Sequence, residues 1–140
     1  MRWTNGAYEI DDDCSRLDMD RVVAWLAESY WAGMQPEAAV RRSWDAAGVT
    51  LGLYHGTQMI GCARAITDFT RFAYLSDVYV EPEHRGHGLG RWLVQTMLDH
   101  PDVSRARWVL HTVDAHGLYS QFGFLSADET VMQRPRPEGM

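Results

Sequence analysis

The segment from Asp77 to Arg91 constrains the fold of this chain more than any other. It begins as an apolar stretch rich in β-forming residues, and this stretch ends just before Pro82. A loop with three glycines follows, and the residues after it have the apolar spacing of a helix. Glycine lets successive backbone N–H groups face one concavity, and a helix N-terminus adds partial positive charge. The segment therefore predicts a strand, an anion-binding loop and a helix, suited to a phosphate or diphosphate group.

Two well-known phosphate-binding patterns do not fit this loop. A P-loop ends in Gly-Lys-Ser/Thr, and the loop contains no lysine. The dinucleotide fingerprint needs the spacing G-x-G-x-x-G, whereas Gly86, Gly88 and Gly90 are evenly spaced. What fits is Arg-x-x-Gly-x-Gly, formed by Arg85, Gly88 and Gly90, which resembles the acyl-CoA diphosphate loop of the GNAT superfamily of N-acetyltransferases. On the loop alone, the alternative is a glycine-rich turn that only joins a strand to a helix.

A second motif lies downstream at the distance expected for this family. Ala115, Tyr119, Gly123 and Phe124 form the pattern Ala-x-x-x-Tyr-x-x-x-Gly-Phe. It is similar to the family motif in which the tyrosine lies beside the sulfur of CoA. The resemblance covers nearly the whole chain and is firmest from Tyr74 to Phe124.

The remaining pattern predicts a single domain over residues 1–140, with no repeat and no linker. Strands are expected at residues 8–10, 49–55, 59–67, 72–80, 106–112, from Phe124 onward and at 131–134. Helices are expected at residues 17–27, 36–47, 90–100 and 117–122. This order is that of an α/β (α+β) GNAT fold, with a mixed, mainly antiparallel sheet of six to seven strands and helices on both faces.

The resemblance implies direct transfer of an acetyl group from acetyl-CoA to an amine, without a covalent enzyme intermediate and without a metal. The thioester oxygen becomes anionic and needs a preorganised donor. By resemblance, backbone N–H groups from Val78 to Val80 supply it. The departing thiolate leaves more easily when it is protonated, and Tyr119 is the candidate acid. The alternative for Tyr119 is an aromatic residue that packs a short helix against the sheet.

The general base is left open among several groups. An alkylammonium must lose a proton before it can attack, so a base or a water chain is required. Asp77 lies on the strand that leads to the loop, and Asp68 and Asp114 are rivals. Successive strand residues point to opposite faces, so Asp77 and Val78 diverge unless a bulge intervenes.

The acyl-CoA contacts expected from the resemblance lie in the two motifs. They are Val78, Tyr79, Val80, Arg85, Gly86, His87, Gly88, Leu89, Gly90, Arg91, Thr112 and Ser120. Arg85 and Arg91 are expected to pair with phosphate, and His87 to offer its backbone N–H. Thr112 departs from the family, which often has asparagine seven residues before the tyrosine to bond the pantetheine arm.

The acceptor side is predicted at Tyr30, Trp31, Asp68 and Asp114. Tyr30 and Trp31 lie between the two early helices, a junction that often overhangs the acceptor pocket in this family. Adjacent aromatic rings there can bind an ammonium group, or can equally pack the first helix.

Composition narrows the function classes further. The formal charge is −6 and no basic block exists, which argues against nucleic-acid binding. No apolar run approaches the ~20 residues that span a bilayer, so a cytoplasmic protein with two free thiols is expected. Apart from His111 and His116, which cluster with Asp114 across a strand end, the six histidines match no metal-ligand spacing. A Ser120–His116 hydrolase pair lacks the nucleophile-elbow context. The leading hypothesis is an N-acetyltransferase for a small-molecule amine, as a monomer or homodimer. Alternatives are acetylation of protein or peptide N-termini and a non-catalytic acyl-CoA-binding domain.

Overall fold

The structure is a computed structural model that describes residues 1–29 and 35–137. Its internal contacts divide the chain into two units, Met1–Leu110 and His111–Met140. Each unit is described by itself below.

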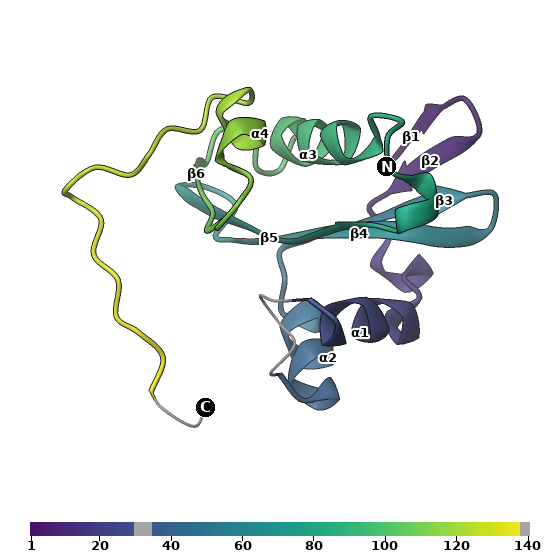
Figure 1. The fold of residues 1–140 in the computed structure, drawn as a ribbon, viewed down its shortest axis with the longest axis horizontal. Helices are drawn as coiled ribbons and strands as arrows, with labels where there is room; N and C mark the ends of the chain where they lie inside the picture. The colour runs from purple at the N-terminus through teal and green to yellow at the C-terminus, as the bar shows by residue number, and fades with distance from the viewer. Residues whose placement is uncertain (30–34, 138–140) are drawn as a thin grey trace. The chain divides into compact units, whose positions relative to one another are not determined.

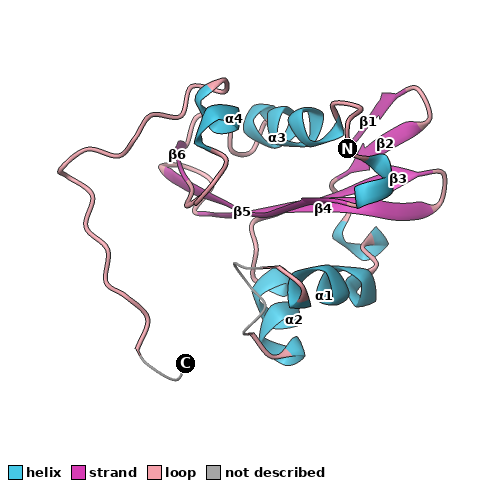
Figure 2. Cartoon of the chain, in the orientation of Figure 1, coloured by secondary structure: helices cyan, strands magenta, loops and turns pink. Residues whose placement is uncertain are grey.

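The first unit is built on one sheet of six strands whose spatial order equals their order along the chain (Figure 2). The strands are β1 (Arg2–Asn5), β2 (Tyr8–Asp11), β3 (Val49–His55), β4 (Gln58–Thr67), β5 (Phe72–Val80) and β6 (Arg107–Val109). Each of the first four strands pairs antiparallel with the next, whereas β5 and β6 are parallel. A parallel pair needs a crossover, and helix α3 (Leu89–Asp99) supplies it. The mixed, mainly antiparallel sheet predicted from the sequence is confirmed.

Helices cover both faces of this sheet. Helices α1 (Met19–Ala27) and α2 (Glu37–Asp45) lie on one face and α3 on the other (Figure 1). Short 3₁₀ turns occupy Cys14–Arg16 and Pro82–His84. The described residues of the second unit contain one short helix, α4 (His116–Ser120). Within the described residues, no helix combines the length and apolar character needed to cross a bilayer.

Apolar side chains fill the space between the sheet and each helix layer. On one face, Trp25 of α1 and Trp44 of α2 pack with Tyr54, Met59 and Cys62 of the sheet. On the other face, α3 contributes the buried residues Leu89, Leu93, Val94, Thr96 and Met97. Burying a large apolar side chain stabilises the fold by about 1.5–3 kcal/mol, so these side chains fix both helix layers to the sheet.

A buried carboxylate ties the end of β2 to its surroundings. Asp11 is only 2% exposed, and its Oδ2 accepts from Arg2 Nε at 3.1 Å and from Arg16 Nη1 at 3.0 Å. Its Oδ1 accepts from the backbone N–H of Asp13 at 2.9 Å. Burial alone would raise the pKa of Asp11, but these donors outweigh burial and lower it.

Asp11→Asn is therefore expected to destabilise the protein by roughly 1.5–3 kcal/mol at neutral pH, the usual worth of hydrogen bonds to a charged group. A carboxylate whose pKa is lowered by folding contributes stability above its unfolded pKa, near 4, and loses that contribution as the pH falls through the folded value. Thermal melts from pH 7 to pH 2 measure this. The wild-type Tm should fall below about pH 4 more steeply than the variant's, and parallel curves would contradict the assignment.

The structure differs from the sequence prediction at four strands. Strand β1 was not predicted, although Asn5-Gly6 is a strong hairpin signal and Gly6 has φ 60° in the turn before β2. The strand predicted at residues 106–112 is confined to Arg107–Val109. The strands predicted from Phe124 and at 131–134 are wrong, because the described residues after Ser120 contain no helix or strand. Pro135 and Pro137 have no N–H to offer a ladder, and the short apolar run before them specifies no partner strand.

Candidate active site

The glycine loop runs from the end of β5 to the first turn of α3. Gly86 and Gly88 have φ values of 86° and 75°, and Gly88 caps the helix. Such left-handed backbone is open to glycine and strained for most other residues. A Cβ added at Gly86, Gly88 or Gly90 would meet nothing within 4 Å, so the space above the loop is open. The first N–H groups of α3 have no intrahelical partner, and this open space is where they can meet an anion.

Side chains from α1 and β5 hold the loop in place. The Arg85 Nε donates to the carbonyl of Val80 at 2.7 Å, and its guanidinium lies 5.4 Å from the ring centre of Tyr79. On the α1 side, the Tyr79 ring stacks on Trp25 with centroids 4.9 Å apart. Arg85, which the sequence assigned to phosphate, thus also braces the end of β5. Arg91 is exposed on the first turn of α3.

Two further contacts fix the entry to the loop. Arg21 of α1 pairs with Glu81, whose side chain is 12% exposed. The hydroxyl of Tyr8 lies 3.1 Å from His84 Nδ1, which links β2 to the 3₁₀ turn before the loop. The His87 ring contacts the His84 carbonyl at 3.2 Å, so this ring is engaged with the loop's own backbone. The loop is thus preorganised by its neighbours, as an anion site requires.

The sheet opens beside β5 just before the loop. The parallel ladder contains the pairs Phe72–Arg107, Ala73–Trp108 and Tyr74–Val109. Beyond them β5 continues to Val80, whereas β6 has ended. Within the described part of the first unit, the stretch of β5 that holds Val78, Tyr79 and Val80 therefore has no strand on its β6 side. Successive backbone N–H groups of a strand point to alternate edges, so those of this stretch that face away from β4 are available to an incoming oxygen.

A bulge interrupts the pairing of β4 with β5 at Asp77. Ser76 pairs with Arg64, and Tyr79 pairs with Cys62. Between these pairs β5 therefore has one residue more than β4. Asp77 has φ 54°, a left-handed conformation that costs a non-glycine residue roughly 1 kcal/mol. Strand alternation alone left undecided whether a bulge separates Asp77 from Val78, and the register of β4 and β5 shows that a bulge is present.

The Asp77 carboxylate is buried and paired. Its Oδ2 accepts from Arg64 Nε at 2.6 Å, and the two side chains are 4% and 13% exposed. Arg64 was not singled out in the sequence, although a signal exists. It lies in the apolar strand segment Gly61–Ile66, and a charge in a buried strand requires a partner.

Asp68 belongs to the β4–β5 turn. Its Oδ1 accepts from the backbone N–H groups of Thr70, Arg71 and Phe72 at 3.0, 2.8 and 3.0 Å. The hydrogen bonds from Thr70, Phe72 and Arg71 lower the pKa of Asp68. From Phe72 to Val78 the strand rises about 20 Å at ~3.3 Å per residue, so Asp68 lies far from the open edge of β5. Its position favours a turn-forming role over a role as base.

Asp68→Asn is expected to leave turnover within about twofold of the wild-type value, because an amide oxygen can still accept the turn's N–H groups and the site is exposed. Steady-state kinetics with the best acceptor measure this. A loss of about a hundredfold would instead identify Asp68 as the base.

In the second unit, the predicted residues are set by local contacts. The Thr112 hydroxyl accepts from the backbone N–H of Ala115 at 3.1 Å and so shapes the turn before α4. Tyr119 is half-buried on α4 and its ring meets Phe124 edge-on at 5.9 Å. The exposed Ser120 donates to the Gly117 carbonyl at 3.0 Å, and Asp114 is exposed. Tyr30 and Trp31 lie outside the described residues.

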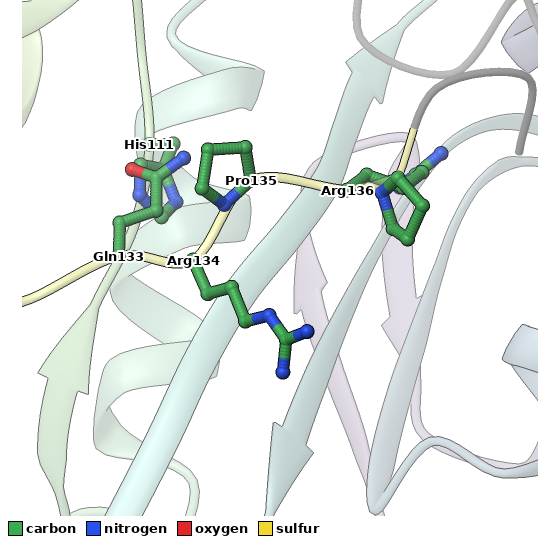
Figure 3. A pocket seen from close by; sticks show the side chains of 6 residues that line it. His111, Gln133, Arg134, Pro135 and Arg136 are labelled. Atoms are coloured by element: carbon green, nitrogen blue, oxygen red, sulfur yellow. The ribbon is translucent and has the colours of Figure 1, made fainter.

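Among the pockets lined by described residues, two lie away from the glycine loop. One, of about 760 Å³, lies in the second unit between His111 and residues 133–137. Figure 3 shows His111 and Gln133 among the residues that line this pocket, with the Arg134 side chain pointing away from both. The other, of about 340 Å³, lies in the first unit and includes Asp12, Trp44 and His100. Neither pocket includes a residue of the glycine loop. Among the described residues, no three His, Cys, Asp or Glu side chains are grouped closely enough to bind a metal ion.

Comparison with known proteins assigns this architecture. The model of the acetyltransferase (GNAT) family matches residues 8–124, which include the strand, loop and helix as well as the Tyr119 motif. The chain belongs to the acetyltransferase (GNAT) family. Because the chain belongs to this family, the open edge of β5 and the glycine loop are parts of an acyltransferase fold.

Relatives agree with this assignment. A candidate acetyltransferase of Gibberella zeae, FG08082, is 36% identical over 119 residues, which cover 69% of this chain and 66% of that protein. The crystal structure of a candidate GNAT acetyltransferase from Xanthomonas campestris pv. campestris is 36% identical, with a TM-score of 0.87 over 93% of this chain and 94% of that one. A candidate acetyltransferase from Clostridium acetobutylicum, solved with acetyl-CoA, shares the fold at 17% identity, with a TM-score of 0.67 over 96% of each chain.

Proposed function

We propose that this protein is an N-acetyltransferase that moves the acetyl group of acetyl-CoA to a primary amine of a small molecule, by direct attack within a ternary complex. The observation that carries the proposal is the glycine loop, with left-handed backbone at Gly86 and Gly88 and open space above it, at the start of α3. Family membership and the open edge of β5 support it.

The loop fits a diphosphate. A side chain at positions 86, 88 or 90 would project into the space where a phosphate must approach the backbone, and glycine keeps this space free. The N–H groups at the start of α3 would hold the diphosphate oxygens, and Arg91, exposed on that turn, would add positive charge. Acetyl-CoA, when bound, supplies an acyl group activated as a thioester.

The chain's own residues would then perform three tasks. N–H groups between Val78 and Val80 would donate to the acyl oxygen as it becomes negatively charged, worth about 3–4 kcal/mol in well-characterised oxyanion holes. Tyr119 is proposed to donate a proton to the departing sulfur, by the resemblance of its motif. The base is proposed to be a water chain to solvent, because Asp68 is engaged in a turn and Asp77 is paired with Arg64.

The acceptor is proposed to be cationic before it loses its proton. The chain carries a formal charge of −6, which favours the approach of an ammonium ion. We also propose a cytoplasmic location, because Cys14 and Cys62 are free thiols, as is usual in a reducing compartment.

The test is release of free CoA thiol from acetyl-CoA by the purified protein with panels of small amines and of peptides, and mass spectrometry of the products. Acetylation of a small amine supports the proposal, and acetylation of peptide N-termini alone would replace it with peptide modification. Binding of acetyl-CoA without turnover on any amine would identify a binding domain. No binding of acetyl-CoA at all would refute the enzyme assignment.

A further inference from the structure

Asp77 combines features that are unusual within a strand. It is buried, it has positive φ, and it lies at the point where β4 and β5 lose their register. The other described non-glycine residue with positive φ, Phe69, lies in a turn between strands. Aspartate adopts this conformation more readily than most residues, but inside a ladder something must hold it there.

The Arg64 side chain holds Asp77 in this conformation. Besides its 2.6 Å bond to Asp77 Oδ2, its Nη1 lies 3.4 Å from the Ser43 carbonyl on α2. The Sγ of Cys62, also on β4, lies 3.4 Å from the Asp77 carbonyl. The bulged residue is thus attached through both its side chain and its backbone to β4, and through Arg64 to the helix layer.

The bulge decides which side chains after it face which layer. Without the extra residue, strand alternation would put Tyr79 on the face opposite Arg64. With it, Tyr79 pairs directly with Cys62 and joins the α1 side, where it stacks on Trp25. Val80 is placed on the other face of the sheet by the same alternation.

We propose that the Arg64–Asp77 pair is a positioning device that holds the bulge and so orients the backbone N–H groups of Val78 to Val80 for acetyl transfer. Asp77 is then a positioning residue and not the general base. This inference rests on the proposed function, since it concerns the donors used in that reaction.

Three variants separate positioning from base catalysis. Asp77→Asn keeps an acceptor oxygen and a residue that tolerates left-handed backbone. Asp77→Ala keeps neither. The double variant Asp77→Gly with Arg64→Met makes the conformation unstrained and leaves no unpaired buried charge. Glu37→Ala, which breaks the exposed Arg41–Glu37 pair on α2, is the control for losing an ion pair.

We expect Asp77→Asn and the double variant to keep kcat within about fivefold of wild type, and Asp77→Ala to lose at least about tenfold with the KM for acetyl-CoA nearly unchanged. Glu37→Ala should match wild type. If Asp77 is the base, Asp77→Asn and the double variant must fall as far as Asp77→Ala, by about a hundredfold or more, and lose the acidic limb of the pH–rate profile. That result would overturn the inference.

A second readout does not depend on turnover. Ring-current shifts of the Tyr79 protons report its stack on Trp25, and NMR can follow them in every variant. Positioning predicts that they persist in Asp77→Asn and in the double variant and change in Asp77→Ala. Unchanged shifts in Asp77→Ala would overturn the inference. If the wild-type protein moves no acetyl group, the proposed function fails, and these shifts alone decide whether the pair holds the bulge.

Discussion

Gly88→Val is expected to weaken acetyl-CoA binding by at least about a hundredfold, the largest single effect we predict. Two causes act together. Gly88 has φ 75°, which a β-branched residue resists, and it is the N-cap residue of α3. A valine side chain would also fill the open space above the loop, where a phosphate must reach the N–H groups.

Titration calorimetry and thermal melts with acetyl-CoA measure this effect. A ligand at one hundred times its Kd stabilises the fold by about 2.7 kcal/mol, so the wild-type protein should melt at higher temperature with acetyl-CoA and the variant should not. Gly6→Val is the matched control, because Gly6 has φ 60° with no atom within 4 Å of an added Cβ, but lies in the β1–β2 turn. Gly6→Val should lose stability and keep its affinity for acetyl-CoA. Equal affinities in wild type and Gly88→Val would rule out the loop as the diphosphate site.

Tyr119→Phe is expected to lower kcat at least about tenfold, because a general acid typically contributes about 10²- to 10⁴-fold, while the affinity for acetyl-CoA changes by less than about twofold. The substitution removes one hydroxyl and retains the ring, so the edge-on contact with Phe124 is preserved. The loss should therefore fall on the chemical step and leave folding and binding intact.

Steady-state kinetics and calorimetry on the same preparation separate these quantities. Tyr54→Phe is the control, because the Tyr54 hydroxyl is buried and has no hydrogen-bond partner among the described residues. Burial raises the pKa of Tyr54 to about 12, so this hydroxyl stays protonated at working pH. Tyr54→Phe should retain full kcat. If Tyr119→Phe also retained it, another group must protonate the sulfur.

The sequence pattern predicted the bounds of strands β3 and β5 and of helix α3 well. Strands β3 and β5 begin and end at the predicted residues, because each is an apolar run with clear stops: Gly48 and Gly56 for β3, and Pro82 just beyond β5. Helix α3 was predicted to within one residue at each end from its glycine entry and the proline after it. The expected strands after Ser120 failed because a strand also needs a partner, which no short run specifies.

The candidate active site likewise has a part that the sequence predicted and a part that it did not. The loop was found from glycine spacing, since the required conformations depend on single residues and their neighbours. The Arg64–Asp77 pair was missed, because it joins residues on different strands through a bulge that shifts the register. Likewise, the contacts of Trp25 with Tyr79 and of Arg21 with Glu81 depend on how α1 lies across the sheet.

The strand order also bears on how this protein reaches its native state. The β1–β2, β3–β4 and β4–β5 pairs are joined by short turns, so these hairpin contacts can assemble early at small entropic cost. The β5–β6 ladder can form only after the crossover that contains α3 has brought β6 beside β5. This ladder is short, so it adds few backbone hydrogen bonds. Amide protons of residues 107–109 should accordingly exchange with deuterium sooner than those of β3 and β4, so this margin of the sheet should open more readily than the central strands.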